Sequence, residues 1–102
     1  MSHATVVRYT TGKETADENE RLIRAVFAQL AEQRPTGLSY SSIRLDDGVS
    51  FVHLAVVDTD DNPLVKLPAF QEFVSAIATR CVEGPVSANG TVIASYGISS
   101  VT

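Results

Sequence analysis

The segment GLSYSSIRLDDGVSFVHLAVV, residues 37–57, contains two runs rich in β-branched and aromatic residues on either side of Asp46-Asp47-Gly48. An Asp-Gly pair between two such runs is a strong signal for a β-hairpin. We therefore expect strands at residues 37–45 and 49–57. With Asp47 and Gly48 at the centre of the turn, the expected register pairs Arg44 with Phe51, Ser42 with His53, Tyr40 with Ala55 and Leu38 with Val57.

Helical patterns lie on both sides of this hairpin. Apolar residues recur at helical spacing from Leu22 to Ala31, after a capping-box pattern at residues 15–18. Arg34-Pro35 should end this helix, because the residue before a proline avoids the helical region. After one helical turn at residues 63–66, Pro68 suits the first position of a second helix. Its apolar stripe runs from Phe70 to Cys81, and Gly84-Pro85 should end it.

The two outer strands are predicted at residues 4–11 and 91–98, where β-branched residues and tyrosines gather. The order of elements is then β-α-β-β-α-β, which is the split βαβ or ferredoxin-like arrangement of an α+β protein. Two right-handed crossovers place both helices on one face of a four-stranded antiparallel sheet. The other face has no cover within the chain.

Composition limits the class of protein. The 102 residues are 44% hydrophobic and 20% charged, which suits one domain, residues 1–102, with a packed core. A net charge of −4 disfavours partners such as nucleic acid or anionic membranes. No apolar stretch approaches the ~20 residues that a membrane span needs. Cys81 is the only cysteine, so no internal disulfide can form, and we expect a cytoplasmic domain.

The two faces of the hairpin differ in character. One alternates through Ile43, Leu45, Val52, Leu54 and Val56, and this aliphatic face is expected beneath the helices. The other is mixed, with Leu38, Tyr40, Arg44, Phe51, His53, Ala55 and Val57. A mixed face suits neither full exposure to water nor a dry core. We expect a second copy of the chain to cover it, giving a homodimer with a partly polar cavity.

Three stretches carry a resemblance to a known family: Gly37-Leu-Ser-Tyr-Ser41, Phe51-Val-His-Leu54 and Leu67-Pro-Ala-Phe-Gln-Glu-Phe73. Together with the order of elements, they resemble the antibiotic-biosynthesis-monooxygenase-like group of dimeric α+β barrels. The resemblance implies a homodimer with a ligand cavity in each subunit. Relatives in that group include cofactor-free oxygenases of polyketide phenols and haem-degrading enzymes.

The family's catalytic positions are not retained in this sequence. Ala55 and Val57 stand where family members commonly place a glutamate and a tryptophan late in the third strand. Leu64 and Ala69 stand where histidines often occur before and at the start of the second helix. The resemblance therefore implies the fold, and the chemistry must be argued from this chain's own residues.

His53 is the candidate catalytic residue, because an imidazole in an apolar strand can act as a general base towards a phenol or an acidic C–H group. The alternative is a buried neutral histidine paired with Ser42 or with a backbone carbonyl. Arg44 is a candidate to hold a carboxylate or enolate oxygen, and its alternative is a bond to Asp46 or Asp47.

Arg8 carries the same ambiguity as Arg44. Tyr40 could stack on an aromatic ligand and donate a hydrogen bond, and Phe51 lies on the same mixed face. No cofactor motif or metal-ligand spacing is present in the sequence, so we expect neither group. Two functions follow: a small cofactor-free enzyme, of oxygenase, isomerase or cyclase type, on an aromatic or polyketide-like molecule, or a non-catalytic dimeric module that binds a small molecule or serves a structural role.

Overall fold

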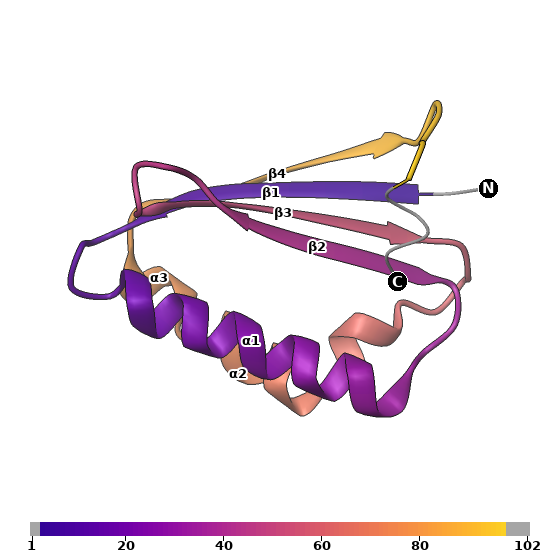
Figure 1. Cartoon of the computed structure of the whole chain (residues 1–102), viewed down its shortest axis with the longest axis horizontal. Coiled ribbons are helices and arrows are strands. Elements are labelled where there is room, and N and C mark those ends of the chain that lie inside the picture. Colours follow the sequence, from indigo (N-terminus) through magenta and orange to yellow (C-terminus); the bar gives the residue numbers. More distant parts are fainter. Residues whose placement is uncertain (1–2, 98–102) are drawn as a thin grey trace.

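The computed structural model describes residues 3–97 and has the expected order of strands and helices. The elements are β1 (His3–Thr11), α1 (Ala16–Gln33), β2 (Leu38–Arg44), β3 (Ser50–Val57), the 3₁₀ turn η1 (Pro63–Lys66), α2 (Pro68–Ser75), α3 (Ile77–Arg80) and β4 (Cys81–Thr91). The sheet has the order β2-β3-β1-β4, and each neighbouring pair is antiparallel. All helices lie on one face of the sheet (Figure 1), which confirms the ferredoxin-like α+β fold. None of the helices in residues 3–97 is long and apolar enough to cross a membrane.

The hairpin that joins β2 and β3 has the predicted register. Arg44 lies opposite Phe51, and the pairing continues to Leu38 opposite Val57. The turn is held by Asp47, whose Oδ1 accepts hydrogen bonds from the amides of Val49 and Ser50 at 2.9 and 2.8 Å. Gly48 has φ of +80°, which an L side chain rarely adopts. The Asp-Gly signal therefore identified both the turn and the alignment of the strands.

The assignment of the two faces was wrong. The mixed face of the hairpin lies beneath the helices: the His53 ring packs against Phe73 of α2, and the Tyr40 ring stacks on Phe27 of α1. Phe51, on the same face, is only 1% exposed. The aliphatic side is the uncovered one. The prediction assumed that polar side chains such as His53 could not lie in the core. In the structure His53 is hydrogen-bonded to Tyr9 and Ser42 beneath the helices, and these bonds remove most of the free-energy cost of burying it.

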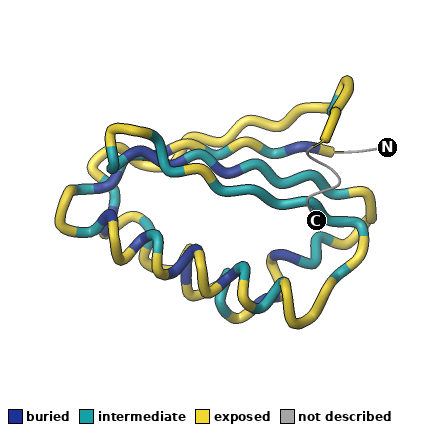
Figure 2. Tube along the Cα trace, viewed as in Figure 1, coloured by how far each residue is buried: buried dark blue, intermediate teal, exposed yellow. Residues whose placement is uncertain are grey.

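The uncovered face of the sheet carries apolar side chains from all four strands. Val6 is 42% exposed, Ile43 53% and Val86 71%. The register places Val52 and Leu54 between them, because Arg8 and Val6 pair with these two residues. Figure 2 shows that exposure is greatest along β4, whereas buried residues lie on β1, β3 and the helices. The uncovered face is therefore the opposite of the one predicted.

Helix α1 begins and ends where the sequence predicts, but the hydrogen bonds at its start differ. Arg34 adopts a left-handed conformation with φ of +47°, and Pro35 follows it. The capping box does not form. The Thr15 hydroxyl donates instead to the carbonyls of Gly12 and Arg80, and Glu18 bonds Arg21. Thr15 thereby ties the start of α1 to the end of α3.

The second helical segment is shorter than the sequence predicts. Helix α2 ends at Ser75, α3 follows after Ala76, and the chain enters β4 at Cys81. Arg80 Nη2 donates to the Phe73 carbonyl at 2.6 Å, the group that a continuous helix would offer to the amide four residues on. Cys81 is therefore the half-buried first residue of β4, not part of a helical stripe, and burial raises the pKa of its thiol.

The last strand also differs from the prediction at residues 91–98. β4 occupies Cys81–Thr91, residues 92–97 are not in a strand, and Ile98 lies outside the described residues. Arg8 pairs with Val86 and Thr10 with Glu83, so Gly84 and Pro85 both lie opposite one residue of β1. Such a bulge at an edge strand accommodates a proline that a central strand would exclude. The sequence predicted that Gly84-Pro85 would end the second helix, because glycine is common just after a helix and proline cannot continue one.

Candidate functional site

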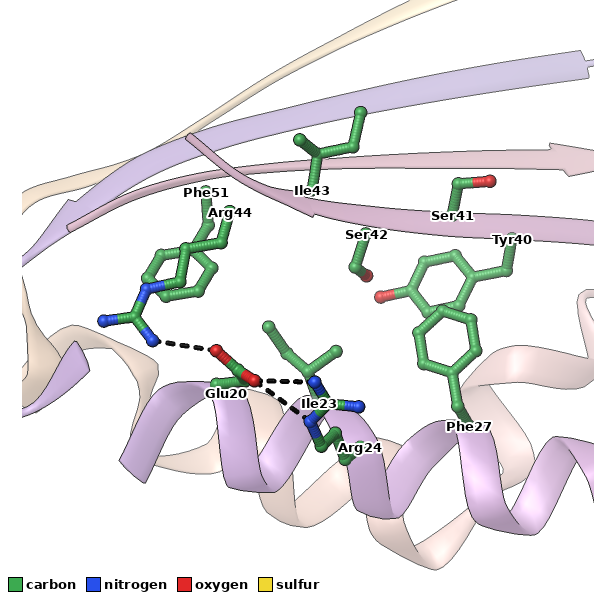
Figure 3. Close-up of a pocket in the computed structure, with 10 residues that line it drawn as sticks. All are labelled: Glu20, Ile23, Arg24, Phe27, Tyr40, Ser41, Ser42, Ile43, Arg44 and Phe51. Atoms are coloured by element: carbon green, nitrogen blue, oxygen red, sulfur yellow. Dashed lines mark hydrogen bonds and ion pairs between the residues drawn. The ribbon is translucent and has the colours of Figure 1, made fainter. Parts of the chain in front are cut away.

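A cavity of about 530 Å³ lies between α1 and the β2 side of the sheet. Its wall includes Glu20, Arg24 and Phe27 from α1 and Tyr40, Ser42 and Arg44 from β2. Figure 3 shows the last three side chains pointing from β2 towards α1, whereas Ile43 points away from the helix. The alternation of a β-strand thus turns the side chains of Tyr40, Ser42 and Arg44 towards α1.

A second cavity, of about 850 Å³, continues along the same groove towards the end of α1. Both cavities are lined by Phe27 and Tyr40, whose rings stack with centroids 5.1 Å apart and planes 11° from parallel. Beyond this pair the wall is formed by Leu30, Pro35 and Leu38, among others. The groove is therefore mostly apolar and aromatic, and its polar groups are concentrated in the first cavity.

A buried hydrogen-bond network reaches the first cavity from behind. His53, 4% exposed, accepts or donates at both ring nitrogens: Nε2 lies 2.7 Å from the Tyr9 hydroxyl, and Nδ1 lies 2.6 Å from Ser42 Oγ and 3.1 Å from the Tyr40 hydroxyl. Asn19 Nδ2 donates to the Tyr9 hydroxyl at 2.8 Å. Ser42 and Tyr40 are therefore the points at which this network meets the cavity.

Burial shifts the pKa of each titratable group in the network. It lowers the pKa of His53 to about 4, so the imidazole is neutral at neutral pH. Burial raises the pKa of Tyr40 to about 12, although a hydrogen bond with Ser42 opposes part of the effect. It also raises the pKa of Tyr9. His53, Tyr9 and Tyr40 are therefore uncharged at neutral pH. Tyr40 and Ser42, which line the cavity, both carry hydroxyl protons.

The charged residues at the cavity pair with one another. Arg44 Nη1 bonds Glu20 at 2.8 Å and Asp17 at 3.1 Å, and its Nε donates to the Gly48 carbonyl. Arg24 also pairs with Glu20. Hydrogen bonds from Arg44, and then from Arg24, lower the pKa of the Glu20 carboxyl. The cavity wall thus holds two guanidinium groups and one carboxylate.

The chain was compared with known proteins by sequence and by structure. No protein-family model matches the sequence, and no curated protein matches it. Solved structures do match: a candidate antibiotic biosynthesis monooxygenase from Nitrosomonas europaea has a TM-score of 0.76 at 12% identity, covering 90% of each chain. A mutant of SnoaB, a cofactor-independent oxygenase from Streptomyces nogalater, has a TM-score of 0.68 at 20% identity, covering 94% of this chain and 97% of that one.

The chain has the antibiotic biosynthesis monooxygenase fold. A further structure described as an antibiotic biosynthesis monooxygenase gives a TM-score of 0.67 at 14% identity and covers 99% of that chain. The resemblance inferred from the sequence is therefore confirmed at the level of the fold. At such identities the neighbours transfer no residue roles, so the site must be interpreted from its own geometry.

Within this monooxygenase fold, four of the five residues selected from the sequence gather in one region. Tyr40, Arg44 and Phe51 line the first cavity, and His53 lies directly behind Tyr40. Arg8 does not join them, because it lies on the exposed outer face opposite Val52. His53 is bonded to Ser42, as the structural alternative for this residue predicted. Arg44 is held in ion pairs, as its structural alternative also predicted, but its partners are Glu20 and Asp17 instead of Asp46 or Asp47.

Sequence reasoning missed Asn19, Arg80 and Glu20. Asn19 is fully buried and lies on the same helical stripe as Ala16 and Ile23, so a polar residue in an apolar stripe was the available signal. Arg80 is 6% exposed, and no sequence pattern indicated its burial.

Among residues 3–97, no three His, Cys, Asp or Glu side chains lie together in a way that could hold a metal ion.

Proposed function

We propose that this protein binds a phenol-like aromatic molecule as its anion in the first cavity and catalyses its oxygenation by dioxygen without a bound cofactor. The observation that carries the proposal is the pair of hydroxyls, from Tyr40 and Ser42, at the wall of an aromatic cavity and in contact with a buried neutral histidine. Hydrogen-bond donors in a site shielded from water stabilise an oxyanion far better than they do in solution.

The composition of the wall supports an anionic aromatic ligand. Arg24 and Arg44 place two guanidinium groups at the cavity, although Glu20 and Asp17 pair with them and leave the cluster without net charge. The stacked rings of Phe27 and Tyr40 offer a flat surface against which an aromatic ring can pack. A phenolate placed with its ring beside Phe27 would reach the hydroxyls with its oxygen. The fold it shares with a cofactor-independent oxygenase adds to this support.

The proposed reaction requires only the phenolate and dioxygen. Dioxygen adds to the ring carbon para to the phenolate oxygen, and protonation gives a hydroperoxide. Loss of water from the hydroperoxide yields a quinone, so one oxygen atom enters the product and the other leaves as water. The hydroxyls of Tyr40 and Ser42 stabilise the phenolate that begins this sequence. His53 holds both hydroxyls in place, and it contacts them directly at Nδ1.

The proposal is tested by oxygen consumption with a panel of hydroxynaphthalenes and hydroxyanthracenes. We expect turnover by the wild type and a loss of about ten- to a hundredfold in Tyr40→Phe and in Ser42→Ala, because each removes one donor to a charged oxygen. Ser39→Ala is the matched control, since Ser39 lies on the same strand but on the outer face, opposite Val56. Wild-type rates in a variant that combines Tyr40→Phe with Ser42→Ala would contradict the proposed site.

A non-catalytic binding module is the alternative function. The ion pairs of Arg44 with Asp17 and Glu20 favour it, because this guanidinium is already satisfied without a ligand. Calorimetry separates the two functions. Binding of a panel member with no oxygen uptake and no product would support the module.

We also propose that the chain forms a homodimer through the uncovered sheet face. Val6, Ile43 and Val86 expose apolar side chains there, and such a face is typical of a protein interface. The second copy would pack its own sheet against these residues. The cavity beside α1 lies on the other face of the sheet, so this interface and the ligand site are separate.

A further inference from the structure

A chain of buried side chains connects the far end of the helical layer to the cavity wall. It runs from Arg80 through Asn19, Tyr9 and His53 to Ser42 and Tyr40. Every fully buried side-chain nitrogen or oxygen in residues 3–97 has a hydrogen-bond partner. Each side chain of this network therefore has at least one hydrogen-bond partner, and the donor and acceptor roles of one link limit those of the next.

At Arg80 the direction of the hydrogen bonds, from donor to acceptor, is fixed. A guanidinium donates hydrogen bonds and accepts none. Arg80 Nε donates to Asn19 Oδ1 at 2.9 Å, and Nη2 donates to the Phe73 carbonyl at 2.6 Å. Arg80 forms no ion pair among residues 3–97. The amide of Asn19 must therefore present its oxygen to Arg80 and its NH₂ group to Tyr9.

This direction passes along the next two links. The Tyr9 oxygen accepts from Asn19 Nδ2, so the hydroxyl proton of Tyr9 is free to donate to His53 Nε2. Nε2 is then an acceptor and carries no proton. The low pKa of His53 keeps the ring neutral, and a neutral imidazole holds one proton. That proton must be on Nδ1, which faces Ser42 and Tyr40.

The position of the His53 proton decides whether an O–H of Ser42 or Tyr40 is available to a ligand in the cavity. When Nδ1 donates, the Ser42 and Tyr40 hydroxyls can bond each other once, and one O–H is left to point into the cavity. When Nδ1 instead accepts, one hydroxyl must donate to it and the other can donate to the first. In that case no O–H need remain for a ligand. The hydroxyls of these two residues point towards each other in Figure 3.

We propose that Arg80 and Asn19 are positioning residues that fix the tautomer of His53 and so keep a hydroxyl donor directed into the cavity. The site then selects a ligand that presents an acceptor oxygen, such as a phenolate or a ketone. It disfavours one that offers only an N–H or O–H donor at this point. The ligand preference rests on the proposed function, whereas the tautomer is a property of the free protein.

The first test is the tautomer of His53 in ¹⁵N-labelled protein at pH 8, from long-range ¹H–¹⁵N correlations of the imidazole ring. The sequence contains one other histidine, so a His3→Gln variant assigns the signals. We expect Nδ1 protonated and Nε2 unprotonated in the wild type. An Nε2-protonated ring in the wild type would overturn the proposal, whatever the variants do.

The second test reverses the direction of the chain. Asn19→Asp keeps the size and an acceptor for Arg80 but replaces the NH₂ donor by an oxygen. Tyr9 should then donate to the new carboxylate, accept from His53 Nε2, and so move the ring proton away from Nδ1. The control is the same substitution in a Tyr9→Phe background, where Asn19→Asp should leave the His53 signals unchanged. An Nδ1 that stays protonated in Asn19→Asp would contradict the proposal.

A ligand probe separates this proposal from the proposed function. 4-Nitrophenolate, whose ionised form absorbs visible light, should bind the wild type about tenfold or more tightly than Asn19→Asp. Failure to bind the wild type, together with a reversible tautomer, would refute the proposed function and leave the positioning role standing. If the wild type turns over phenols but its His53 is protonated at Nε2, the positioning role is refuted and the proposed function stands. Equal binding by both proteins, with a reversed tautomer, would overturn the proposed ligand preference.

Discussion

Lowering the pH should destabilise this protein through His53, by an amount that the burial of the ring sets. The pKa of His53 is about 4 in the folded chain, against an ordinary value of 6.5. Between these values the unfolded chain binds a proton that the folded chain does not, so stability falls as the pH falls through this window. For a shift of this size, the loss between pH 7.5 and pH 4.5 is about 2.5 kcal/mol.

The assay is urea denaturation followed by circular dichroism at both pH values, in wild type and in His53→Gln. Glutamine cannot titrate, and it can accept from Tyr9 and donate to Ser42 much as the neutral ring does. The carboxyl pKa values of Glu20 and Asp47 are lowered by hydrogen bonds, so they also contribute to acid destabilisation in both proteins. The difference between the two proteins isolates the contribution of His53.

Equal acid sensitivity in wild type and His53→Gln would refute this reasoning. It would mean that His53 gains its proton without cost, and hence that the ring is not enclosed between the sheet and the helices. A wild type that is less acid-sensitive than the variant would indicate that the histidine pKa is raised instead of lowered. Either result would also remove the support for a neutral imidazole in the hydrogen-bond chain.

Three further predictions concern stability and assembly. Tyr9→Phe should cost about 2–4 kcal/mol, because it leaves two buried polar groups unpaired, whereas Tyr96→Phe, at a 98% exposed side chain, should cost almost nothing in urea denaturation. Gly37→Ala should destabilise more than Gly48→Ala in thermal melts: both have positive φ, but a Cβ at Gly37 would collide with the Thr59 methyl group and one at Gly48 meets nothing within 4 Å. Leu54→Asp should convert a dimer to a monomer in light scattering, and an unchanged mass would exclude the outer face as the interface.

The sequence was sufficient for the order of elements and the register of the hairpin, but not for the choice of face. β3 has apolar residues on both sides, so periodicity alone could not decide which side the helices cover. The presence of Tyr40, Arg44 and His53 on one side suggested contact with solvent or a partner. In the structure Tyr40 and His53 are hydrogen-bonded beneath the helices, where Tyr9, from a strand distant in sequence, also bonds His53. Such long-range pairing leaves no local pattern.

The other failures have the same origin. Arg80 ends a short helix and reaches Asn19, 61 positions away, so its role depends on a contact that no window of sequence contains. The strand at residues 81–91 was missed because Gly84 and Pro85, which have low strand propensity, were interpreted as the end of a helix. Its pairing with β1, and the bulge, override that preference. Signals from neighbouring residues were reliable for the hairpin turn and for the bounds of α1, whereas contacts between distant elements determined the candidate site.

The bulge in β4 also makes the two free edges of the sheet unequal as templates for aggregation. β4 carries Gly84 and Pro85, and a bulged edge with a proline that lacks an N–H offers a poor surface for another strand. β2 forms the opposite edge with seven residues, Leu38–Arg44, that contain neither glycine nor proline. Unwanted strand addition between copies, as in amyloid growth, should therefore begin at β2, and covering or charging that edge is the direct way to suppress it.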